Sequence, residues 1–255
     1  MVLGATMTFT SCSNDNDDND ATSTVINPAK VFTGGLPKSV AGMTIRTNEK
    51  GQVISMEEHG EGIVTFQYKE AAARSTDPDV VMTIGGRYVL NLYLDKNGFV
   101  RHCKEYYLGE SEREDTWDFT YNSDGQLLTM LRSEGGNEKT TIKYQDGNIV
   151  ETATVEADEP EESSSHKVYY TSTNTPSPIE NKGCIMLFDR TFGIDMDEME
   201  YAYYAGLLGK ATKNLPIRLV NNKGYSADLS NGEFFWTLNS AGYPISLNGT
   251  YSFTW

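Results

Sequence analysis

Histidine and cysteine are the residue types most able to do metal or nucleophilic chemistry, and both are scarce in this chain. Its three histidines are His59, His102 and His166. None makes an i, i+4 pair, and none sits with a cysteine or an aspartate at the spacing of metal ligands. His102 is followed by Cys103, which on paper pairs a base with a nucleophile. Adjacent residues of a strand point to opposite faces, so we do not expect the two side chains to meet.

Other catalytic signatures are also missing. The sequence has no Gly-x-Ser-x-Gly elbow, no phosphate-binding loop and no dinucleotide fingerprint. Asp95-Lys-Asn-Gly98 begins like a calcium loop but lacks the later ligands, so a turn is predicted there. Carboxylates are abundant, and only the fold could pair two of them for hydrolysis. We therefore assign no catalytic residue, no metal and no cofactor from the sequence.

Cys12 is the residue with the clearest chemical prediction. It follows a weakly apolar stretch of small residues, 1–10, and precedes the Asp/Asn-rich run 13–20. This arrangement resembles the end of a signal peptide and a bacterial lipobox, in which the cysteine is acylated. Phe9 is unusual three residues before such a cysteine. The basic start of a signal peptide is missing, so either the precursor begins upstream or the chain has been shortened.

The predicted organisation follows from this cysteine. Residues 1–11 are expected to be a signal-peptide remnant, 12–29 a lipidated acidic linker, and 30–255 a single β-meander domain. No other segment approaches the ~18 consecutive apolar residues of a spanning helix, so the lipid would be the link to the membrane. The acidic run resembles a tag for export to the cell surface, although a solvated spacer would have the same composition. The expected location is the outer membrane, lipid-anchored, with surface exposure left open.

Charge and the remaining cysteines add two expectations. The net charge is −15 and the pI is near 4.6, without a Lys/Arg cluster, which excludes nucleic acid as an expected partner. Cys103 and Cys184 could form a disulfide in an oxidising compartment. Two independent thiols are favoured, because nothing in the sequence brings the two residues together.

Turn dipeptides and period-two patterns predict the fold. Asn97-Gly98, Asp124-Gly125, Asp146-Gly147 and Asn248-Gly249 are hairpin signals, because both central positions of the favoured turn need positive φ. Apolar residues alternate with polar ones between the turns, as in the row Trp117, Phe119 and Tyr121. This is typical of antiparallel strands. The fold class is mainly β, an antiparallel meander forming a curved sheet or an up-and-down barrel.

One segment has a helical pattern. Asp195-Met-Asp-Glu198 is predicted to be a capping box in which the Asp195 carboxylate accepts from amides near Glu198. Apolar residues then recur at helical spacing up to the stop signal Gly209-Lys210, which predicts one helix near 196–208. Its apolar stripe is expected to pack on the sheet or plug it.

The helix and its flanks also resemble a known family. The stretches that carry the resemblance are Phe192-Gly-Ile-Asp195, Tyr204-Ala-Gly-Leu-Leu-Gly-Lys210 and Lys213-Asn-Leu-Pro216. With the hairpins and Cys12, they resemble an uncharacterised lipoprotein family of gut Gram-negative anaerobes, a domain of unknown function (4595) with porin-like fold. The hairpins also resemble tyrosine–aspartate repeats of bacterial surface proteins. The resemblance implies a curved or closed β-meander with one helix and brings no functional residues with it.

Aromatic side chains are the remaining clue to function. Most of the 15 tyrosines and other aromatic residues are expected in the core. If the meander encloses a cavity, some of them would line it, and the ligand-binding candidates are Tyr88, Trp117, Tyr121, Tyr203 and Trp236. The expected function is a non-enzymatic binding or accessory protein for a glycan, a peptide, an amphipathic molecule or an envelope protein. The alternatives are a carboxylate-dependent hydrolase and a purely structural envelope component; the oligomeric state stays open.

Overall fold

A computed structural model describes residues 26–58, 62–69, 76–109, 114–223 and 232–255. The first strands are β1 (Ser39–Val40), β2 (Met43–Thr47), β3 (Val53–Glu58), β4 (Gly62–Tyr68), β5 (Val80–Ile84), β6 (Tyr88–Leu94), β7 (Val100–Tyr107), β8 (Glu114–Tyr121) and β9 (Leu127–Arg132). The later strands are β10 (Glu138–Gln145), β11 (Asn148–Val155), β12 (Ser164–Tyr169), β13 (Ile179–Glu180), β14 (Asn214–Leu215), β15 (Arg218–Lys223), β16 (Gly232–Glu233), β17 (Trp236–Leu238), β18 (Pro244–Leu247) and β19 (Tyr251–Thr254). The helical segments are η1 (Pro28–Lys30), α1 (Glu134–Asn137), the π-helical η2 (Phe188–Phe192) and α2 (Met199–Tyr204).

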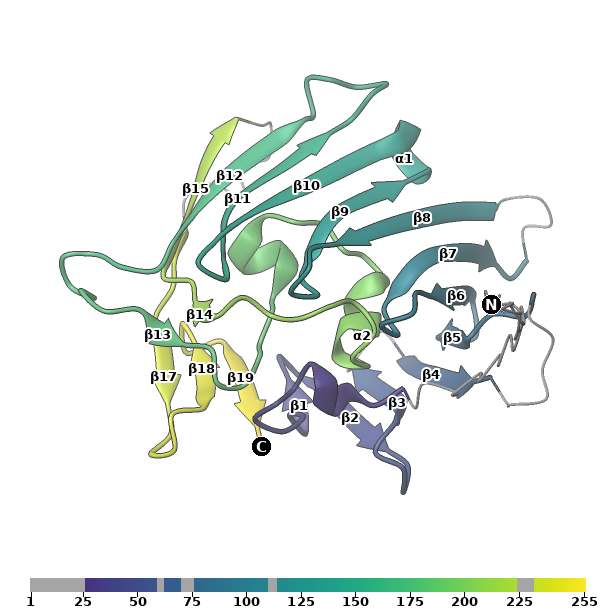
Figure 1. Cartoon of the computed structure of the whole chain (residues 1–255), viewed down its shortest axis with the longest axis horizontal. Coiled ribbons are helices and arrows are strands. Elements are labelled where there is room, and N and C mark those ends of the chain that lie inside the picture. Colours follow the sequence, from purple (N-terminus) through teal and green to yellow (C-terminus); the bar gives the residue numbers. More distant parts are fainter. Residues whose placement is uncertain (1–25, 59–61, 70–75, 110–113, 224–231) are drawn as a thin grey trace, which may run out of the picture.

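Nearly all of these strands form one antiparallel sheet. Each strand from β2 to β12 pairs with the next in the chain, and β12 then pairs with β15 and β15 with β16. At the other end, β2 pairs with β1, β1 with β19, and the C-terminal strands β19, β18 and β17 follow. The sheet curls strongly but is not closed into a barrel (Figure 1). The predicted antiparallel β-meander is confirmed, in its open, curved form.

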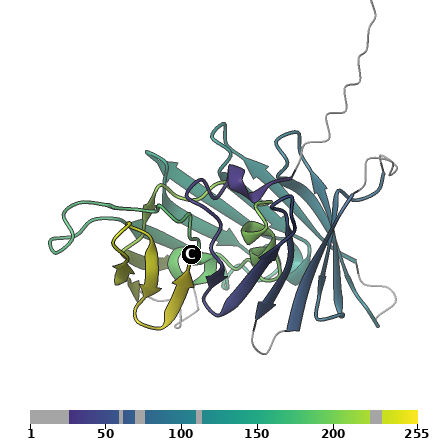
Figure 2. The same ribbon diagram turned by 90° about the horizontal axis from the view of Figure 1, so that it is seen from below.

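The concave face of the sheet is filled by the chain itself. Residues 184–208, with η2 and α2, run through the curl, and the view turned by 90° shows the strands arching around them (Figure 2). Phe188, Phe192, Met199 and Tyr204 are each at most 2% exposed. They pack against inward residues of the sheet such as Leu92 and Phe119. Each such side chain contributes about 1.5–3 kcal/mol by leaving water, so this segment is the centre of the core.

The α2 helix is shorter than predicted. It covers Met199–Tyr204 instead of 196–208, and its N-cap Glu198 makes no side-chain capping bond. The predicted capping box is wrong because Asp197 has a left-handed φ of +42°, which interrupts a helix. The Asp195 carboxylate accepts from the Asp197 amide at 3.1 Å, an Asx turn just before the helix.

Gly206 ends α2 three residues before the predicted stop. Its N–H donates to Tyr203 O at 2.8 Å, and the Leu207 N–H donates to Ala202 O at 3.0 Å. These are the two bonds of a Schellman motif, which requires a left-handed residue, and Gly206 has φ +78°. Leu207 and Leu208, expected to continue the helix, lie in the extended chain that follows.

That extended chain crosses the tips of three hairpins. The Val100 N–H donates to Leu207 O at 2.8 Å, the Lys210 N–H to Gly125 O at 2.8 Å, and the Lys213 N–H to Gly147 O at 2.9 Å. Successive hairpin tips are therefore met at intervals of three residues along the crossing chain. The stretch 204–216 thus contacts the glycine turns directly, through the carbonyl groups of Gly125 and Gly147.

The predicted hairpin turns are confirmed, but their geometry is of two kinds. Both central residues have positive φ in Asp146-Gly147 and Asn248-Gly249. In the Asn97-Gly98 and Asp124-Gly125 turns, positive φ is limited to the glycine, and the residue three before it organises the loop. The Asp95 carboxylate accepts from the Asn97 and Phe99 amides, and the Asn122 side chain makes the equivalent bonds. The Asp95 segment is therefore a turn, as predicted, in which its carboxylate bonds to backbone amides.

Candidate functional site

Two of the predicted ligand-binding aromatics belong to the core. Trp117 is 0% exposed and its indole N–H donates to the Glu105 carboxylate at 3.0 Å. Tyr203 is 1% exposed and its hydroxyl donates to Cys184 O at 2.7 Å. Burial places the pKa of Tyr203 well above its ordinary value, so the phenol is a neutral donor. Neither ring is open to solvent in the described structure.

The other three are half-buried and lie apart. The Tyr121 hydroxyl donates to Val100 O at 2.6 Å beside a hairpin tip. Trp236, in β17, donates to Pro216 O at 2.7 Å, and Tyr88 packs edge-on against Tyr107 with ring centroids 5.1 Å apart. None of the five candidates lines the surface hollow described next. Their role in binding stays a prediction.

A small hollow lies between the β1–β2 hairpin and α2. We call it the rim pocket; its volume is about 110 Å³ and its lining is Val40, Ala41, Met43, Asp197, Glu200, Tyr201 and Tyr204. Val40, Met43 and Tyr204 are at most 6% exposed and form an apolar floor. The Tyr204 hydroxyl is bound to Met186 O at 2.6 Å, inside the core. Asp197, which is exposed, and Glu200, which is half-buried, place two carboxylates on its wall.

Further carboxylates surround the start of α2 on the same side of the sheet. Besides Asp197, they are Glu105 of β7, Glu138 of β10, Asp195 and Glu198, and we call this group the acidic rim. Arg132 of β9 donates to the Asp197 carboxylate at 2.7 Å, and its guanidinium carbon lies 4.6 Å from the Trp117 ring centroid. Arg132 is only 8% exposed, so its charge is screened less by water and interacts more strongly with the nearby carboxylates.

Burial is the main cause of the raised pKa values in this region, and neighbouring carboxylates add to it. Burial, and then the Glu105 carboxylate, raise the pKa of Glu198 to about 7. Burial, and then Asp195, raise the pKa of Glu138. The pKa of Tyr88 is raised by burial and then by Glu198. One Glu198 carboxylate oxygen is buried without a hydrogen bond to any described residue, which adds to the cost of ionising it.

The Glu105–Glu198 pair is the kind of coupled carboxylate pair that a hydrolase would need. Glu105 is 7% exposed and engaged by Trp117, and neither glutamate lines the rim pocket. A general acid must reach the substrate within hydrogen-bonding distance. The pair therefore gives no specific support to hydrolysis.

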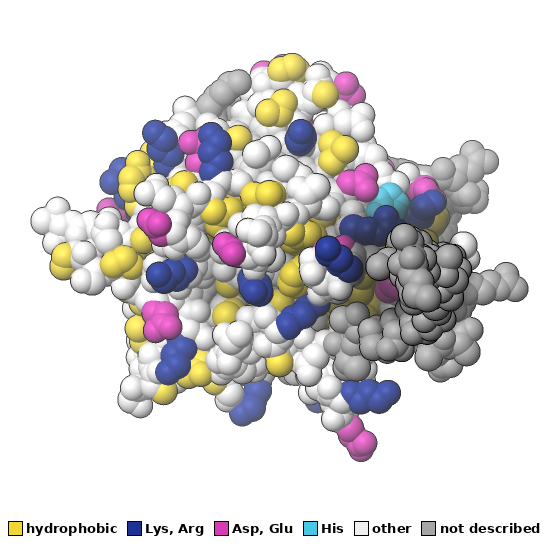
Figure 3. Space-filling model, viewed as in Figure 1, with side chains coloured by type: hydrophobic (Ala, Val, Ile, Leu, Met, Phe, Trp, Pro, Cys, Tyr) yellow, Lys and Arg dark blue, Asp and Glu magenta, His cyan; other side chains and the backbone are white. Residues whose placement is uncertain are grey.

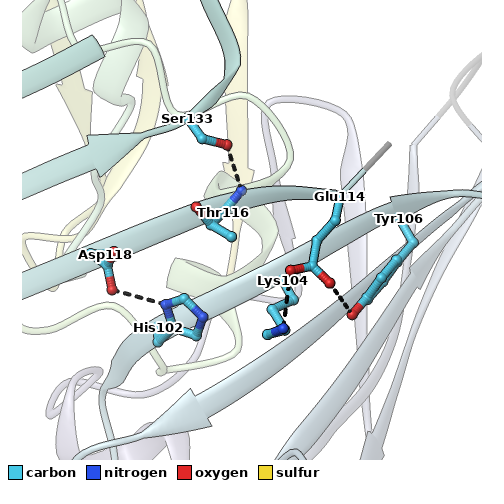
Figure 4. Close-up of polar contacts among 7 residues, drawn as sticks. All are labelled: His102, Lys104, Tyr106, Glu114, Thr116, Asp118 and Ser133. Carbon is cyan, nitrogen blue, oxygen red and sulfur yellow. Dashed lines mark hydrogen bonds and ion pairs between the residues drawn. The ribbon is translucent and has the colours of Figure 1, made fainter. Parts of the chain in front are cut away.

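The convex face of β7 and β8 carries a polar network, shown in Figure 4. His102 Nδ1 lies 2.8 Å from the Asp118 carboxylate, and Glu114 accepts from Lys104 at 3.0 Å and from the Tyr106 hydroxyl at 2.6 Å. Cys103 is 0% exposed on the opposite face, so His102 and Cys103 do not meet, as predicted. Exposed cross-strand pairs of this kind contribute little to stability. Charges of both signs are interspersed on the face in Figure 3, with hydrophobic side chains between them.

Two other features outside the rim pocket bear on the sequence predictions. Cys103 and Cys184 are free thiols, in agreement with the favoured prediction. Ligand oxygens of Glu156, Glu159 and Glu162 lie within 4.8 Å of one another in the loop after β11. Burial, and then Glu162, raise the pKa of Glu156. Nothing else in that loop points to a bound ion.

His166 of β12 is a buried imidazole. It is 1% exposed, and neither ring nitrogen has a hydrogen-bond partner among the described residues. Gly193 lies against the ring so closely that a Cβ there would stand 2.5 Å from it. Across the strand pair, Asn221 also has a buried side-chain oxygen without a partner in the described structure. Burial lowers the pKa of His166 below its ordinary 6.5, so the fold holds the neutral form.

Replacing His166 with leucine is expected to reduce the loss of stability in acid. Above about pH 6.5 the imidazole is neutral in both the folded and the unfolded chain. Below that pH, protons bind preferentially to His166 in the unfolded chain, so the free energy of unfolding decreases as the pH is lowered. The free energy of unfolding, measured with urea at pH 8 and pH 5, should drop less in His166→Leu than in the wild type. Val155→Ala, at an exposed and non-titrating position of the neighbouring strand β11, is the control and should leave the drop unchanged. An equal drop in His166→Leu and wild type would contradict the prediction.

Comparisons with known proteins bear on the whole fold. The family model described as "Domain of unknown function (DUF4595) with porin-like fold" matches residues 40–246. A crystal structure of a porin-like protein from Bacteroides uniformis ATCC 8492 has a TM-score of 0.61 and 18% identity, covering 83% of this chain and 89% of that one. A porin-like protein from Bacteroides vulgatus ATCC 8482 has a TM-score of 0.53 and 16% identity, with 85% and 98% covered. At these identities the likeness shows the fold alone.

Two further searches gave negative findings. A search of curated proteins found no match to this chain. Within the described ranges, no helix is both long and apolar enough to span a membrane.

Proposed function

The chain belongs to the family described as a domain of unknown function (DUF4595) with porin-like fold, and we propose that it is a non-enzymatic binding or accessory lipoprotein of the outer membrane. The rim pocket is the observation that carries the binding role. It combines an apolar floor with carboxylates at a surface position, a lining suited to binding one chemical group of a larger partner.

The filled interior supports binding at the surface. The segment 184–208 occupies the concave face, and the inward aromatic residues Trp117, Tyr203 and Tyr204 are at most 1% exposed. A ligand would therefore reach the rim pocket or the outer faces of the sheet. A glycan, a peptide, an amphipathic molecule or an envelope protein remains the range of partners.

Cys12 supports the membrane anchor. It lies outside the described residues, between an apolar stretch of small residues and an acidic run, where a lipobox cysteine would stand. Acyl chains add about 0.8 kcal/mol of membrane affinity per buried CH₂ group, so several chains hold a protein stably on a bilayer. The described domain would then project from the outer membrane on the linker that follows Cys12.

Acylation of Cys12 is the first test. Residues 1–255 would be expressed behind a basic leader in a Gram-negative host that is fed an alkyne-labelled fatty acid. Wild-type protein should carry the label and fractionate with the outer membrane, whereas Cys12→Ser should be unlabelled and soluble. Cys184→Ser is the matched control and should remain labelled. An unlabelled wild-type protein would remove the anchor from the proposal.

The binding role is tested separately. The purified full chain would be screened by thermal shift and calorimetry against glycans, peptides and amphipathic molecules, and used in pull-downs from envelope extracts. A reproducible ligand or partner supports the proposal. Empty screens together with empty pull-downs would leave a structural envelope role as the better explanation.

A further inference from the structure

A row of polar side chains crosses the concave face of the sheet where η2 ends. Thr152 of β11 lies opposite His166 of β12, and His166 lies opposite Asn221 of β15. The Thr152 hydroxyl donates to Phe192 O at 2.7 Å and so binds η2 to the sheet. His166 is 1% exposed, and neither ring nitrogen nor the buried Asn221 Oδ1 has a hydrogen-bond partner among the described residues. Three buried polar atoms are thus left without a partner there, which is unusual in a folded protein.

The imidazole ring of His166 is covered by the residue that ends η2. Gly193, the C-cap of η2, faces the Nδ1–Cε1 edge of the ring so closely that an added Cβ would stand 2.5 Å from both atoms. No hydrogen-bond acceptor can enter between Gly193 and this edge. A neutral imidazole has one N–H donor, whereas the protonated ring has two. Protonation is therefore disfavoured as long as Gly193 covers the ring.

Charged side chains of the strands around His166 lie on the other face of the sheet. Glu151 of β11 and Lys167 of β12 are each one residue away from the polar row and lie opposite each other. Both therefore point to the convex face, because successive strand residues alternate. Arg218 of β15 is also exposed on that face, with its guanidinium carbon 5.4 Å from the Tyr169 ring centroid. These charges do not face the ring.

Carboxylates of the segment that covers the ring respond to acid with the opposite sign. The Asp189 carboxylate lies 3.7 Å from Arg190 Nε, and Asp195 is exposed and accepts from a backbone amide. Burial raises the pKa of Asp189 and of Glu198, whereas burial lowers the pKa of His166. A carboxyl with a raised pKa stabilises the folded form as the pH falls, and a base with a lowered pKa destabilises it. Loosening of this segment in acid would therefore come from His166.

We propose that His166 is a pH-sensitive switch that holds η2 on the sheet when neutral and releases it when protonated. The neutral ring packs on Gly193. The ring that has taken up a proton from solvent turns away from Gly193 and donates to Asn221 Oδ1, which frees the end of η2. Asn221 is near enough, because directly opposite strand residues have Cβ atoms about 4.5–5.5 Å apart. The switch goes beyond the proposed function, since it controls access to the concave face where Phe188 and Phe192 are buried.

Hydrogen–deuterium exchange of the full chain at pH 8 and pH 5, read by mass spectrometry, tests the switch. Protection factors are corrected for the intrinsic exchange rate at each pH. Between pH 8 and pH 5 the peptide covering 184–196 should lose protection about threefold or more, because the released form binds one proton preferentially. Peptides from β6 should keep their protection, since the sheet stays folded.

Three variants make the test specific. His166→Leu removes the titrating group and should abolish the loss of protection in acid; His166→Gln should do the same if the leucine variant fails to fold. Thr152→Val, the matched control, removes the hydrogen bond to Phe192 O. It should lower protection of 184–196 at both pH values and keep the difference between them. Asn221→Leu removes the acceptor of the protonated ring and should move the loss of protection to lower pH.

Three results would overturn the inference. An equal loss of protection in β6 would show general unfolding in acid in place of local release. An unchanged loss in the folded His166 variant would assign the effect to another group. A loss that is the same in Asn221→Leu and in the wild type would exclude the movement of the ring toward Asn221.

Discussion

Replacement of Gly206 by alanine is expected to destabilise the folded chain by about 3 kcal/mol or more, near the upper end of single-substitution effects. Gly206 has φ +78°, where a Cβ costs about 1–2 kcal/mol. The added Cβ would also stand 2.5 Å from the Pro28 Cα, a backbone atom that cannot rotate away. The substitution would disturb the Schellman motif that ends α2 and the contact of η1 with it. Urea-induced unfolding would measure the change in free energy.

Gly249→Ala is the matched control for Gly206→Ala. Gly249 has a similar φ of +70° in the last hairpin turn, but an added Cβ would meet nothing within 4 Å. Its loss should be limited to the backbone term, about 1–2 kcal/mol. Comparable losses in the two variants would show that the approach of Pro28 to Gly206 does not matter.

Replacement of Arg132 by methionine is expected to cost about 2 kcal/mol at pH 8, less than the 3–5 kcal/mol of a fully buried broken pair, because Asp197 is partly exposed. Methionine keeps an apolar stem against Trp117 but removes the cation that binds Asp197. Arg132 also lowers the pKa of Glu198 and Glu138, so both carboxylates become harder to ionise without it.

The loss caused by Arg132→Met should be larger at pH 8 than at pH 5. Burial raises the pKa of Glu198 from 4.5 to about 7, so folding favours its neutral form. Stability from this group is fully present below about pH 4.5, falls as the pH rises through the window to about 7, and stays low above it. At pH 5 the carboxyl is mostly protonated in the folded chain, and the missing guanidinium matters less.

Two further variants make the Arg132 prediction specific. Arg132→Met combined with Glu198→Gln should recover part of the stability at pH 8 and little at pH 5, because the charge that lost its partner is removed. Arg46→Met breaks an exposed contact with Glu57, at 3.9 Å, and should change stability by less than about 0.5 kcal/mol at both pH values. An Arg132→Met loss that is the same at pH 5 and pH 8 would contradict this account. Urea titrations at the two pH values measure all four proteins.

Sequence patterns that span only a few residues were sufficient to predict the strands and the turns. The alternation of Trp117 and Phe119 with polar neighbours predicted the inward face of β8, because successive strand residues point to opposite sides. Asp146-Gly147 predicted a hairpin because its turn needs positive φ at both positions. The same argument placed His102 and Cys103 on opposite faces, and the apolar stripe around Met199 and Tyr203 correctly located the helix.

The first and last residues of the α2 helix could not be predicted from such local patterns. Gly206 and Gly209 both resemble stop signals, and both have positive φ. Gly206 ends α2 in a Schellman motif and lies against Pro28, from the other end of the chain, while Gly209 lies against the Gly125 hairpin tip. Asp197, predicted to lie inside the helix, is instead left-handed and bound to Arg132 of a distant strand. Contacts between segments that are distant in the sequence therefore determine where α2 begins and ends.

The candidate site depended still more on remote contacts. Glu105, Arg132 and Glu198 have no shared pattern in the sequence, and Val40 and Glu200 come from opposite ends of the chain. The open sheet curls around one of its own connecting segments (Figure 1). This places Val40 and Glu200 in the lining of one pocket, and Glu105 and Arg132 within electrostatic reach of Glu198. Local sequence specifies the backbone geometry and the inward face of each strand, since those follow from the sterics of neighbouring residues. The curl and the path of residues 184–208 follow from the packing of the whole chain, and they alone assemble the acidic rim and its pocket.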